Sequence, residues 1–442
     1  MGNDLFEKAP IPKAYMKMAL PVVMGMIVTL VYNLVDTYFI ALTGNTDLIA
    51  GISICAPLFT LLLAVGDIFG IGGSSVISRL LGAGDEKGAT KRSTFCFYCV
   101  VIVGVVFTAL MLIFQKQILL LLGATDATYE YAAQYYRWLM LGSTFVIFSL
   151  VPSNVMRAEG ASVASMIGSM IGTVVNIILD PIFIFALGFG AAGAAMATII
   201  GYICTCTFFV IYILKKSRIL SLSISNFKPD LKILSEILVI GLPSSITNLM
   251  QTIGITLTNR FLQPYGNESI AVMGIVLKIV NIAVLVLVGL AFGGQPLYGY
   301  NYGAKNHDRL KKSLGFGMAV TGGTGAVLLI ILSLFANPLV SAFLKDAQLI
   351  SSGISMLRMQ LLGMPLMGIC LVMICAFQST GKAVSAFVLS ACRQGIVYLP
   401  IIIIASTLFG RQGVVMSQAL SDVFTTVVAF MILRNGLYKE IK

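Results

Sequence analysis

Long apolar runs recur along the whole chain, and they constrain its fold more than any other feature. A helix of about 20 residues crosses about 30 Å of hydrocarbon, so each run is long enough to span a bilayer. The runs are continuous, whereas the strands of a membrane barrel alternate polar and apolar residues. About twelve spanning helices are expected, near residues 14–42, 51–78, 94–114, 131–152, 163–186, 191–214, 234–262, 270–298, 314–337, 353–376, 383–408 and 412–433.

Composition supports an all-α polytopic membrane protein. Of the 442 residues, 58% are hydrophobic and only 11% are charged, which excludes a soluble surface over most of the chain. A net charge of +11 favours nucleic-acid binding in a soluble protein, so the placement of the basic residues decides between the two interpretations.

The basic residues gather in alternate connecting segments. By the positive-inside rule these segments face the cytoplasm. We therefore expect a multi-pass protein of the cell (inner) membrane with both termini cytoplasmic and no nucleic-acid partner. The cytoplasmic group is Lys8, Lys13, Lys17, Arg79, Lys87, Lys91, Arg92, Arg157, Lys215, Lys216, Arg218, Lys228, Lys232, Lys305, Arg309, Lys311, Lys312, Lys382, Arg434, Lys439 and Lys442; the outer group is only Lys116, Arg260, Lys345 and Arg411.

The chain repeats itself on either side of a basic segment, residues 215–233. Pro21 and Pro243 open the first span of each half, and they are 222 residues apart. This predicts six-helix bundles at 1–214 and 234–442, joined by a cytoplasmic linker at 215–233. Because six spans is an even number, both halves run in the same direction, and such pseudo-symmetric bundles enclose a central cavity.

Several motifs, in their order along the chain, resemble the multidrug and toxic-compound extrusion (MATE) transporters. They are Ser-Arg-Leu-Leu-Gly-Ala-Gly at 78–84, Arg-Ala-Glu-Gly at 157–160 and Gly-Gly-Gln-Pro-Leu-Tyr-Gly-Tyr-Asn-Tyr-Gly-Ala at 293–304. The resemblance covers nearly the whole chain. It is closest to the bacterial branch that has Asn-x-x-x-Asp-Pro in the fifth helix, and it implies a secondary-active exporter of multiple drugs.

Two carboxylates lie inside predicted spans, where an ionisable group costs several kcal/mol and usually has a function. Asp36 is near the middle of the first span, and Asp180 follows Asn176 by four residues, which places both on one face of the fifth. Pro181 has no amide hydrogen and should leave the carbonyl of Ile177 free. Together with the hydroxyl of Thr198, these are hard oxygen ligands that suit a sodium ion or a shared proton.

The resemblance implies the same set, Asp36, Asn176, Asp180 and Thr198, for cation coupling. The equivalent positions in the second half hold Thr258 and Ile401, so we expect the intramembrane acids in the first half only. Another branch of the family couples through acids in the seventh and tenth helices, and Gly241–Leu262 and Gly353–Ala376 contain none. The alternative is purely structural, with Asp36 and Asn33 hydrogen-bonded within the bundle and Asp180 accepting from Asn176.

Other polar residues carry weaker predictions. Asn33 and Asp67 are candidates for lining the cavity, and pairing with a basic residue is the alternative for Asp67. Lys278, Arg358 and Arg393 are expected in structural ion pairs, and Glu159 and His307 in solvated or locally paired positions in cytoplasmic turns. Cys96-x-x-Cys99 has the spacing of a metal or redox pair but lacks a second pair of ligands, so it is expected to pack.

A cation-coupled antiporter is the function these features favour. Pro21 and Pro181 are expected to bend their helices, and we expect a proton or sodium ion at Asp36 and Asp180 to bend the first helix at Pro21. This would drive export of amphipathic organic cations by alternating access, from a monomer without any other cofactor. A flippase for a lipid-linked precursor is the alternative. An enzyme is excluded, because one His in a cytoplasmic turn offers no catalytic pair at membrane depth.

Overall fold

The computed structural model describes residues 2–441, and every regular element within them is helical. The residues pack into two compact units. Unit 2 contains Met24–Ser245, and unit 1 contains Asn3–Val23 together with the described part of Ile246–Lys442. The predicted all-α class is confirmed.

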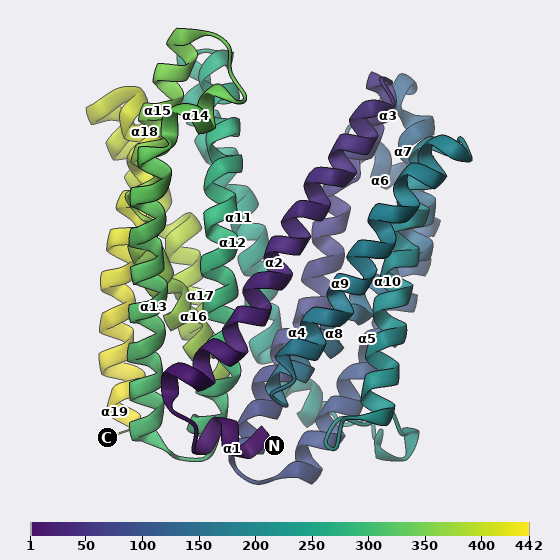
Figure 1. Cartoon of the computed structure of the whole chain (residues 1–442), viewed down its shortest axis with the longest axis vertical. Coiled ribbons are helices and arrows are strands. Elements are labelled where there is room, and N and C mark those ends of the chain that lie inside the picture. The colour runs from purple at the N-terminus through teal and green to yellow at the C-terminus, as the bar shows by residue number, and fades with distance from the viewer. Residues whose placement is uncertain (1, 442) are drawn as a thin grey trace. The chain divides into compact units, whose positions relative to one another are not determined.

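Unit 2 is built from the first six spans and their connections (Figure 1). Its elements are most of α2 (Ile11–Leu42), α3 (Thr46–Ile54), α4 (Ala56–Gly82), α5 (Glu86–Ile113), α6 (Gln115–Leu121), α7 (Asp126–Leu141), α8 (Ser143–Ala158), α9 (Ser162–Pro181), η1 (Ile182–Ala186), α10 (Gly190–Lys215), η2 (Ile224–Asn226) and the start of α11 (Leu231–Leu262).

Unit 1 is built from the other spans and from both ends of the described chain. Its elements are α1 (Gly2–Glu7), the start of α2, the rest of α11, η3 (Gln263–Tyr265), α12 (Asn267–Gly303), α13 (His307–Leu334), α14 (Ala336–Ser341), α15 (Ala347–Leu361), α16 (Met364–Ser379), α17 (Ala383–Ala391), η4 (Cys392–Ile396), α18 (Tyr398–Ile432), η5 (Leu433–Leu437) and α19 (Tyr438–Glu440).

The span count agrees with the prediction. In the described chain nine continuous helical stretches are long and apolar enough to cross a membrane, and two bent pairs raise this to eleven. The pairs are α7 with α8, bent by 48°, and α15 with α16, bent by 41°. The longest stretch, Ala383–Glu440, holds two spans, because the backbone of Gly410 leaves the helical region at φ 57° and ψ −134°. Dividing it there gives the predicted twelve.

The first span of each half begins in the unit that the other half mainly forms. α2 passes from unit 1 to unit 2 after Val23, two residues beyond Pro21, and α11 passes from unit 2 to unit 1 after Ser245, two residues beyond Pro243. Glycines allow each end to pack closely, since a Cβ on Gly293 would come within 2.2 Å of the Cα of Ala19. The predicted division of the chain at residues 215–233 stays a prediction.

Matching contacts hold the start of α11 in unit 2. A Cβ on Gly241 would lie 2.0 Å from the carbonyl oxygen of Ile68, and one on Gly72 would lie 2.4 Å from the carbonyl oxygen of Ile237. The Ser245 hydroxyl also donates to the carbonyl of Ala64 over 2.7 Å. The helices therefore touch backbone to backbone, which only glycine permits at such distances.

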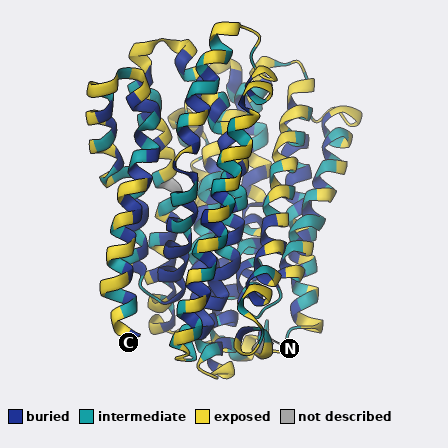
Figure 2. Cartoon of the chain, turned by 60° about the vertical axis from the view of Figure 1, so that its left-hand side comes forward, coloured by how far each residue is buried: buried dark blue, intermediate teal, exposed yellow. Residues whose placement is uncertain are grey.

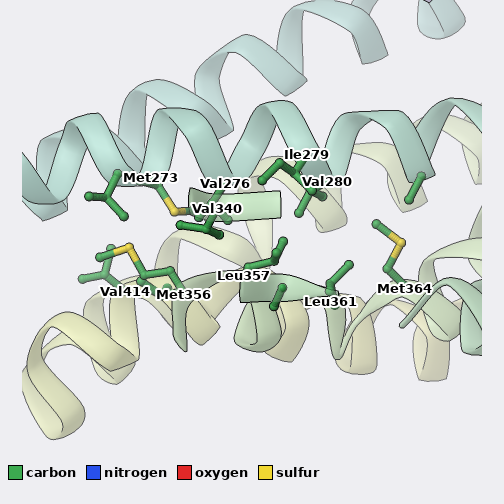
Figure 3. Close-up of a cluster of buried hydrophobic side chains, with 14 of the residues drawn as sticks. Met273, Val276, Ile279, Val280, Val340, Met356, Leu357, Leu361, Met364 and Val414 are labelled. Atoms are coloured by element: carbon green, nitrogen blue, oxygen red, sulfur yellow. The ribbon is translucent and has the colours of Figure 1, made fainter. Parts of the chain in front are cut away.

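Apolar side chains fill the unit interiors and also cover the outside. In unit 1, Met273 and Val276 of α12 point toward Val340 and toward Leu357 of α15 (Figure 3). Exposed positions recur along the full length of the helices (Figure 2), and many are large and apolar, such as Ile113 at 70%. Water does not tolerate so much exposed apolar surface, whereas lipid does.

Both ends of the described chain dock at the same end of unit 1, beside the turn between α12 and α13 (Figure 1). The Tyr300 hydroxyl donates to Glu7 over 2.6 Å, and the Phe6 ring stacks on Tyr300 with centroids 4.9 Å apart. Glu440 accepts from the Tyr302 hydroxyl and pairs with the Lys382 ammonium. The two tyrosines of the Tyr-Asn-Tyr-Gly motif thus fix opposite ends of the chain.

Candidate functional site

The site in unit 2 begins at the end of α9. Asn176 and Asp180 are one turn apart on the same face, and they are only 3% and 0% exposed. Pro181 ends the α-helical pattern, and the wider turn of η1 follows, in which the Leu187 amide donates to the Ile182 carbonyl over 2.9 Å. A proline without an amide hydrogen explains the change of helix type, which often occurs at functional sites. The free Ile177 carbonyl stays a prediction.

Thr198 of α10 orients the Asn176 side chain. The Asn176 Nδ2 donates to the Thr198 Oγ1 over 3.2 Å, and that hydroxyl donates to the Ala194 carbonyl over 3.0 Å. With its nitrogen engaged, Asn176 presents Oδ1, which is buried and accepts no bond from any described residue. Gly172 and Gly201 make this contact between helices close, since a Cβ on Gly201 would lie 2.6 Å from the Gly172 carbonyl oxygen.

Asp36 of α2 brings a second carboxyl to Asp180. The two carboxyls lie close enough for the charge of Asp36 to act on Asp180. Within residues 2–441 no N–H or O–H group donates to either oxygen of Asp180, and both oxygens are buried. Two ionised carboxylates carry no hydrogen to share, so a proton or a cation must join them if they are to lie together. The predicted set of Asp36, Asn176, Asp180 and Thr198 is therefore brought together in one place.

Three tyrosines surround the cluster, and sequence reasoning missed them. The Tyr32 hydroxyl lies 3.5 Å from the Thr198 Oγ1, Tyr135 interacts electrostatically with Asp36 and Asp180, and Tyr202 interacts with Tyr32 and Tyr135. Spacing offered a signal for two of them, because Tyr32 precedes Asp36 by four residues and Tyr202 follows Thr198 by four. Tyr135 lies on α7, and only the tertiary fold brings it here.

The structure places the two cavity candidates differently. Asn33 is exposed on α2, where its carbonyl accepts from the Thr37 hydroxyl over 2.7 Å. Asp67 is half-buried on α4. A role of either in lining a cavity stays a prediction.

The equivalent place in unit 1 is neutral. Thr258, which corresponds to Asp36, shares a hydrogen bond of 2.6 Å with the Tyr398 hydroxyl. The Ser417 hydroxyl also donates to Tyr398, over 3.4 Å. These hydroxyl groups are hydrogen-bonded to one another and carry no charge that a bound cation would neutralise. The position of Thr258 in unit 1 therefore differs in its chemistry from that of Asp36 in unit 2.

One expectation about the second half is wrong. Asp422 is an intramembrane acid of α18, 3% exposed, that the sequence analysis did not consider. It accepts from the Arg393 Nε over 2.7 Å, which confirms the predicted ion pair of Arg393.

Lys278 and Arg358 are exposed and pair with no carboxylate among the described residues, so the same prediction is wrong for them. Exposed long basic side chains can extend to the membrane surface instead.

Glu159 has the predicted local role. It accepts from the Ser217 hydroxyl over 2.8 Å and from the Arg218 amide over 3.1 Å, which ties the turn after α8 to the segment after α10. Burial raises the pKa of Glu159 above its ordinary value, while the hydrogen bond from Ser217 opposes this.

Comparison with known proteins identifies relatives over the whole chain. The MatE family model matches residues 21–182 and again residues 243–404, so each copy begins at the proline of a first span. The multidrug export protein MepA of Staphylococcus saprophyticus is 32% identical over 428 residues, which cover 97% of this chain and 94% of that protein. MepA of Staphylococcus aureus matches at the same identity and coverage.

Solved structures agree. A multidrug resistance MATE family transporter of the MOP superfamily in an outward-facing conformation aligns with a TM-score of 0.93 and 26% identity, covering 98% of this chain and 97% of that one. A MATE protein in the bent conformation aligns with a TM-score of 0.92 and 26% identity, covering 100% of this chain and 99% of that one. A MATE in the straight conformation also gives a TM-score of 0.92.

Proposed function

The chain belongs to the MatE family of transporters, and from this premise we propose that it exports amphipathic organic cations in exchange for protons or sodium ions. The relatives are multidrug export proteins and not enzymes. The many apolar spans support a multi-pass place in the membrane. In this proposal a proton or sodium ion drives export through an alternating-access cycle.

The observation that carries the proposal is the pair of unpartnered oxygens on Asp180. A buried carboxylate without a donor is costly to ionise, and the cost is greater at membrane depth. A bound proton or sodium ion removes this cost, so the ion and the site stabilise each other. Asp36, Asp180 and the Asn176 Oδ1 would be the ligands, all of them hard oxygens. Thr198 would hold Asn176 in place, because its hydroxyl is already bonded on both sides.

Coupling would run through α2, which carries both Asp36 and Pro21. The part of α2 before Met24 packs in unit 1, and the part with Asp36 packs in unit 2. A change in the hydrogen bonding of Asp36 would bend α2 at Pro21, where the ring removes a backbone bond. Solved MATE proteins in bent and straight conformations support two states in this family.

Topology completes the proposal. The distribution of Lys and Arg favours cytoplasmic termini in the cell membrane, and α1 and α19 dock at one end of unit 1, which fits an even number of spans. We expect a monomer that binds no nucleic acid. A bilayer and a small amphipathic molecule would be its partners.

Efflux of ethidium from proteoliposomes, measured with sodium and pH gradients imposed separately, tests the function. One gradient should drive efflux by the natural chain. Asp36→Asn and Asp180→Asn should each abolish the dependence on that gradient, because neither amide can take up the ion. Asp47→Asn, an acid in the first turn of α3, serves as the control and should leave transport unchanged. Full coupled transport by both site variants would refute the proposal.

A further inference from the structure

The first turns of the described chain form a helix that is too short to be stable by itself. α1 has six residues, and isolated helices shorter than about 12–15 residues are marginal in water. Phe6 of this helix is nevertheless only 1% exposed, and its ring stacks on that of Tyr300 in α12. Contacts with other elements of unit 1 must therefore hold α1 in its helical form.

Arg309 of α13 supplies two of these contacts. Its Nε donates to the Phe6 carbonyl over 2.6 Å, and its Nη2 donates to the Ala9 carbonyl over 2.5 Å. Carbonyl groups at the end of a helix have no partner within it, and the negative end of the helix dipole attracts a cation there. The Tyr300 hydroxyl of α12 bonds to Glu7. Arg309 and Tyr300 thus hold α1 from two helices.

The motif of α12 at residues 293–304, which has no role in the proposed cycle, also holds the start of α2. The Tyr15 hydroxyl donates to the Leu290 carbonyl over 3.0 Å and accepts from the Tyr298 hydroxyl over 3.4 Å. A Cβ on Gly294 would lie 2.5 Å from the Cε2 of Tyr15, so glycine is needed for this approach. The glycines of the motif admit α2, and its tyrosines bond to α1 and α2.

Burial along α2 changes abruptly after Val23. From Met24 to Phe39, a stretch that the structure describes completely, no residue is buried. A Cβ on Gly25 would meet no atom within 4 Å. α2 therefore has a tightly packed first part and a loosely packed second part, and Asp36 lies on the second. The apolar residues of the first part that are at most 8% exposed are Ala14, Tyr15, Met18, Ala19, Val22 and Val23.

We infer that Arg309 and Tyr300 are positioning residues for ion coupling. They hold residues 6–23 as a fixed anchor in unit 1, so an ion at Asp36 bends α2 beyond this anchor instead of moving the whole helix. Hinge motion turns one rigid part against another, so one side has to be held. Without the anchor the ion would still bind, because the acid pair belongs to unit 2, but export would no longer follow.

The inference rests on the proposed function, because it assigns the part of the chain that passes the effect of the ion to the exporter. Two variants release the anchor through different contacts. Arg309→Ala removes both bonds to the backbone of the N-terminal segment, and Phe6→Ala removes the ring that stacks on Tyr300.

Hydrogen–deuterium exchange of the purified full-length chain, followed by mass spectrometry, measures the release directly. In both variants the amides of residues 2–20 should exchange about tenfold faster than in the natural chain, because their helical form depends on the lost contacts. The amides of α9 in unit 2 should keep the natural rate.

Ethidium efflux from proteoliposomes then tests the consequence. In both variants the maximal rate of ion-driven efflux should fall about fivefold or more. The ion concentration for half-maximal efflux and the affinity for ethidium should each stay within about twofold. Damage to the fold would change the affinities together with the rate, so this split separates positioning from misfolding. If Arg309→Ala does not fold, then Phe6→Ala and Tyr300→Phe, which loses only the bond to Glu7, carry the same test.

Two matched variants serve as controls. Lys312→Ala removes an exposed positive charge from the same helix as Arg309, and Tyr302→Phe removes a bond to α19 at the other docked end of the chain. Both should keep the natural exchange of residues 2–20 and the natural efflux. An equal loss of efflux in Tyr302→Phe would contradict the inference.

The exchange and efflux results together decide between the proposals. Natural exchange of residues 2–20 in both Arg309→Ala and Phe6→Ala would overturn the anchor. Faster exchange with undiminished ion-driven efflux would overturn its role in coupling, while the proposed function would stand. If the natural chain itself shows no ion-driven efflux, then the proposed function fails and this inference fails with it.

Discussion

At the scale of single residues, the site depends on which atom of Asn176 is engaged. Thr198 takes the amide nitrogen, and this leaves the oxygen beside the two carboxyls. A residue that orients a ligand without contacting the ion still sets the affinity of the site, because it fixes the geometry before the ion arrives.

Thr198→Val should therefore weaken ion binding without abolishing transport. Loss of one hydrogen bond costs about 0.5–1.5 kcal/mol, so the concentration of the coupling ion needed for half-maximal efflux should rise roughly two- to thirteenfold. Thr198→Ser should stay near the natural value. Thr207→Val on the same helix removes an exposed hydroxyl that bonds to the Ile203 carbonyl, and it should have no effect. An unchanged ion requirement in Thr198→Val would contradict the positioning role.

Some residues of the site could be predicted from the sequence, and others could not. Asp36, Asn176, Asp180 and Thr198 could be assembled in advance because helical spacing and the resemblance pointed to the same residues. Tyr135 could not, since it reaches the site from α7 only in the folded unit. Asp422 was missed because its first-half equivalent is Gly201, so neither repeat nor resemblance drew attention to it.

At the scale of elements, short segments at the ends of helices fix the bundle of unit 1. Glu440 of α19 accepts from Tyr302 at the end of α12 and pairs with Lys382 at the start of α17. These contacts join three elements that are far apart in the sequence. The helices themselves were predictable from apolar length, whereas such contacts depend on tertiary packing.

Glu440→Gln should lower the thermal stability of the purified chain in a pH-dependent way. The hydrogen bond from Lys382, followed by that from Tyr302, lowers the pKa of Glu440 below its ordinary value of 4.5. A lowered pKa means that the contribution is present above the ordinary pKa and is lost as pH falls through the folded value. The difference in Tm between natural chain and variant should thus be largest near neutral pH and should vanish in acid.

Thermal unfolding across this pH range is the measurement. Glu268→Gln, in the first turn of α12, serves as the control for removing a negative charge. A difference in Tm that is constant with pH would argue against the ion pair as the cause. Because Glu440 is half exposed, the effect should be modest and should shrink in high salt.

At the scale of the whole molecule, two repeats of one pattern differ in their chemistry. The family model matches both halves, each beginning at its own proline. One unit has the acid pair, and the other has neutral hydroxyls in the equivalent place together with an ion pair of Arg393 and Asp422, where the first half has Gly172 and Gly201. The sequence predicted the repeat and the neutral Thr258, but only the structure revealed that the hydroxyls of Thr258 and Tyr398 satisfy each other.

Pro21→Ala and Pro243→Ala form a matched pair that tests this asymmetry. Both changes restore a backbone hydrogen bond in the first span of a half. Pro21→Ala should reduce ion-driven ethidium efflux severalfold, because its helix carries Asp36. Pro243→Ala should retain the ion dependence, because its helix carries Thr258 instead. Equal effects of the two variants on the ion dependence would show that coupling does not run through α2.

The exchanged starts of α2 and α11 have a consequence for how this protein is made. Because translation proceeds from the N-terminus, the start of α2 must wait for α12 to be synthesised before Ala19 and Val23 reach Gly293 and Gly289. Cutting the chain between Lys215 and Leu231 would give two fragments. The second would lack the start of α2, which packs in unit 1, and the first would lack the start of α11, which packs in unit 2. Such fragments should accumulate only when produced together, so maturation of either half requires the whole.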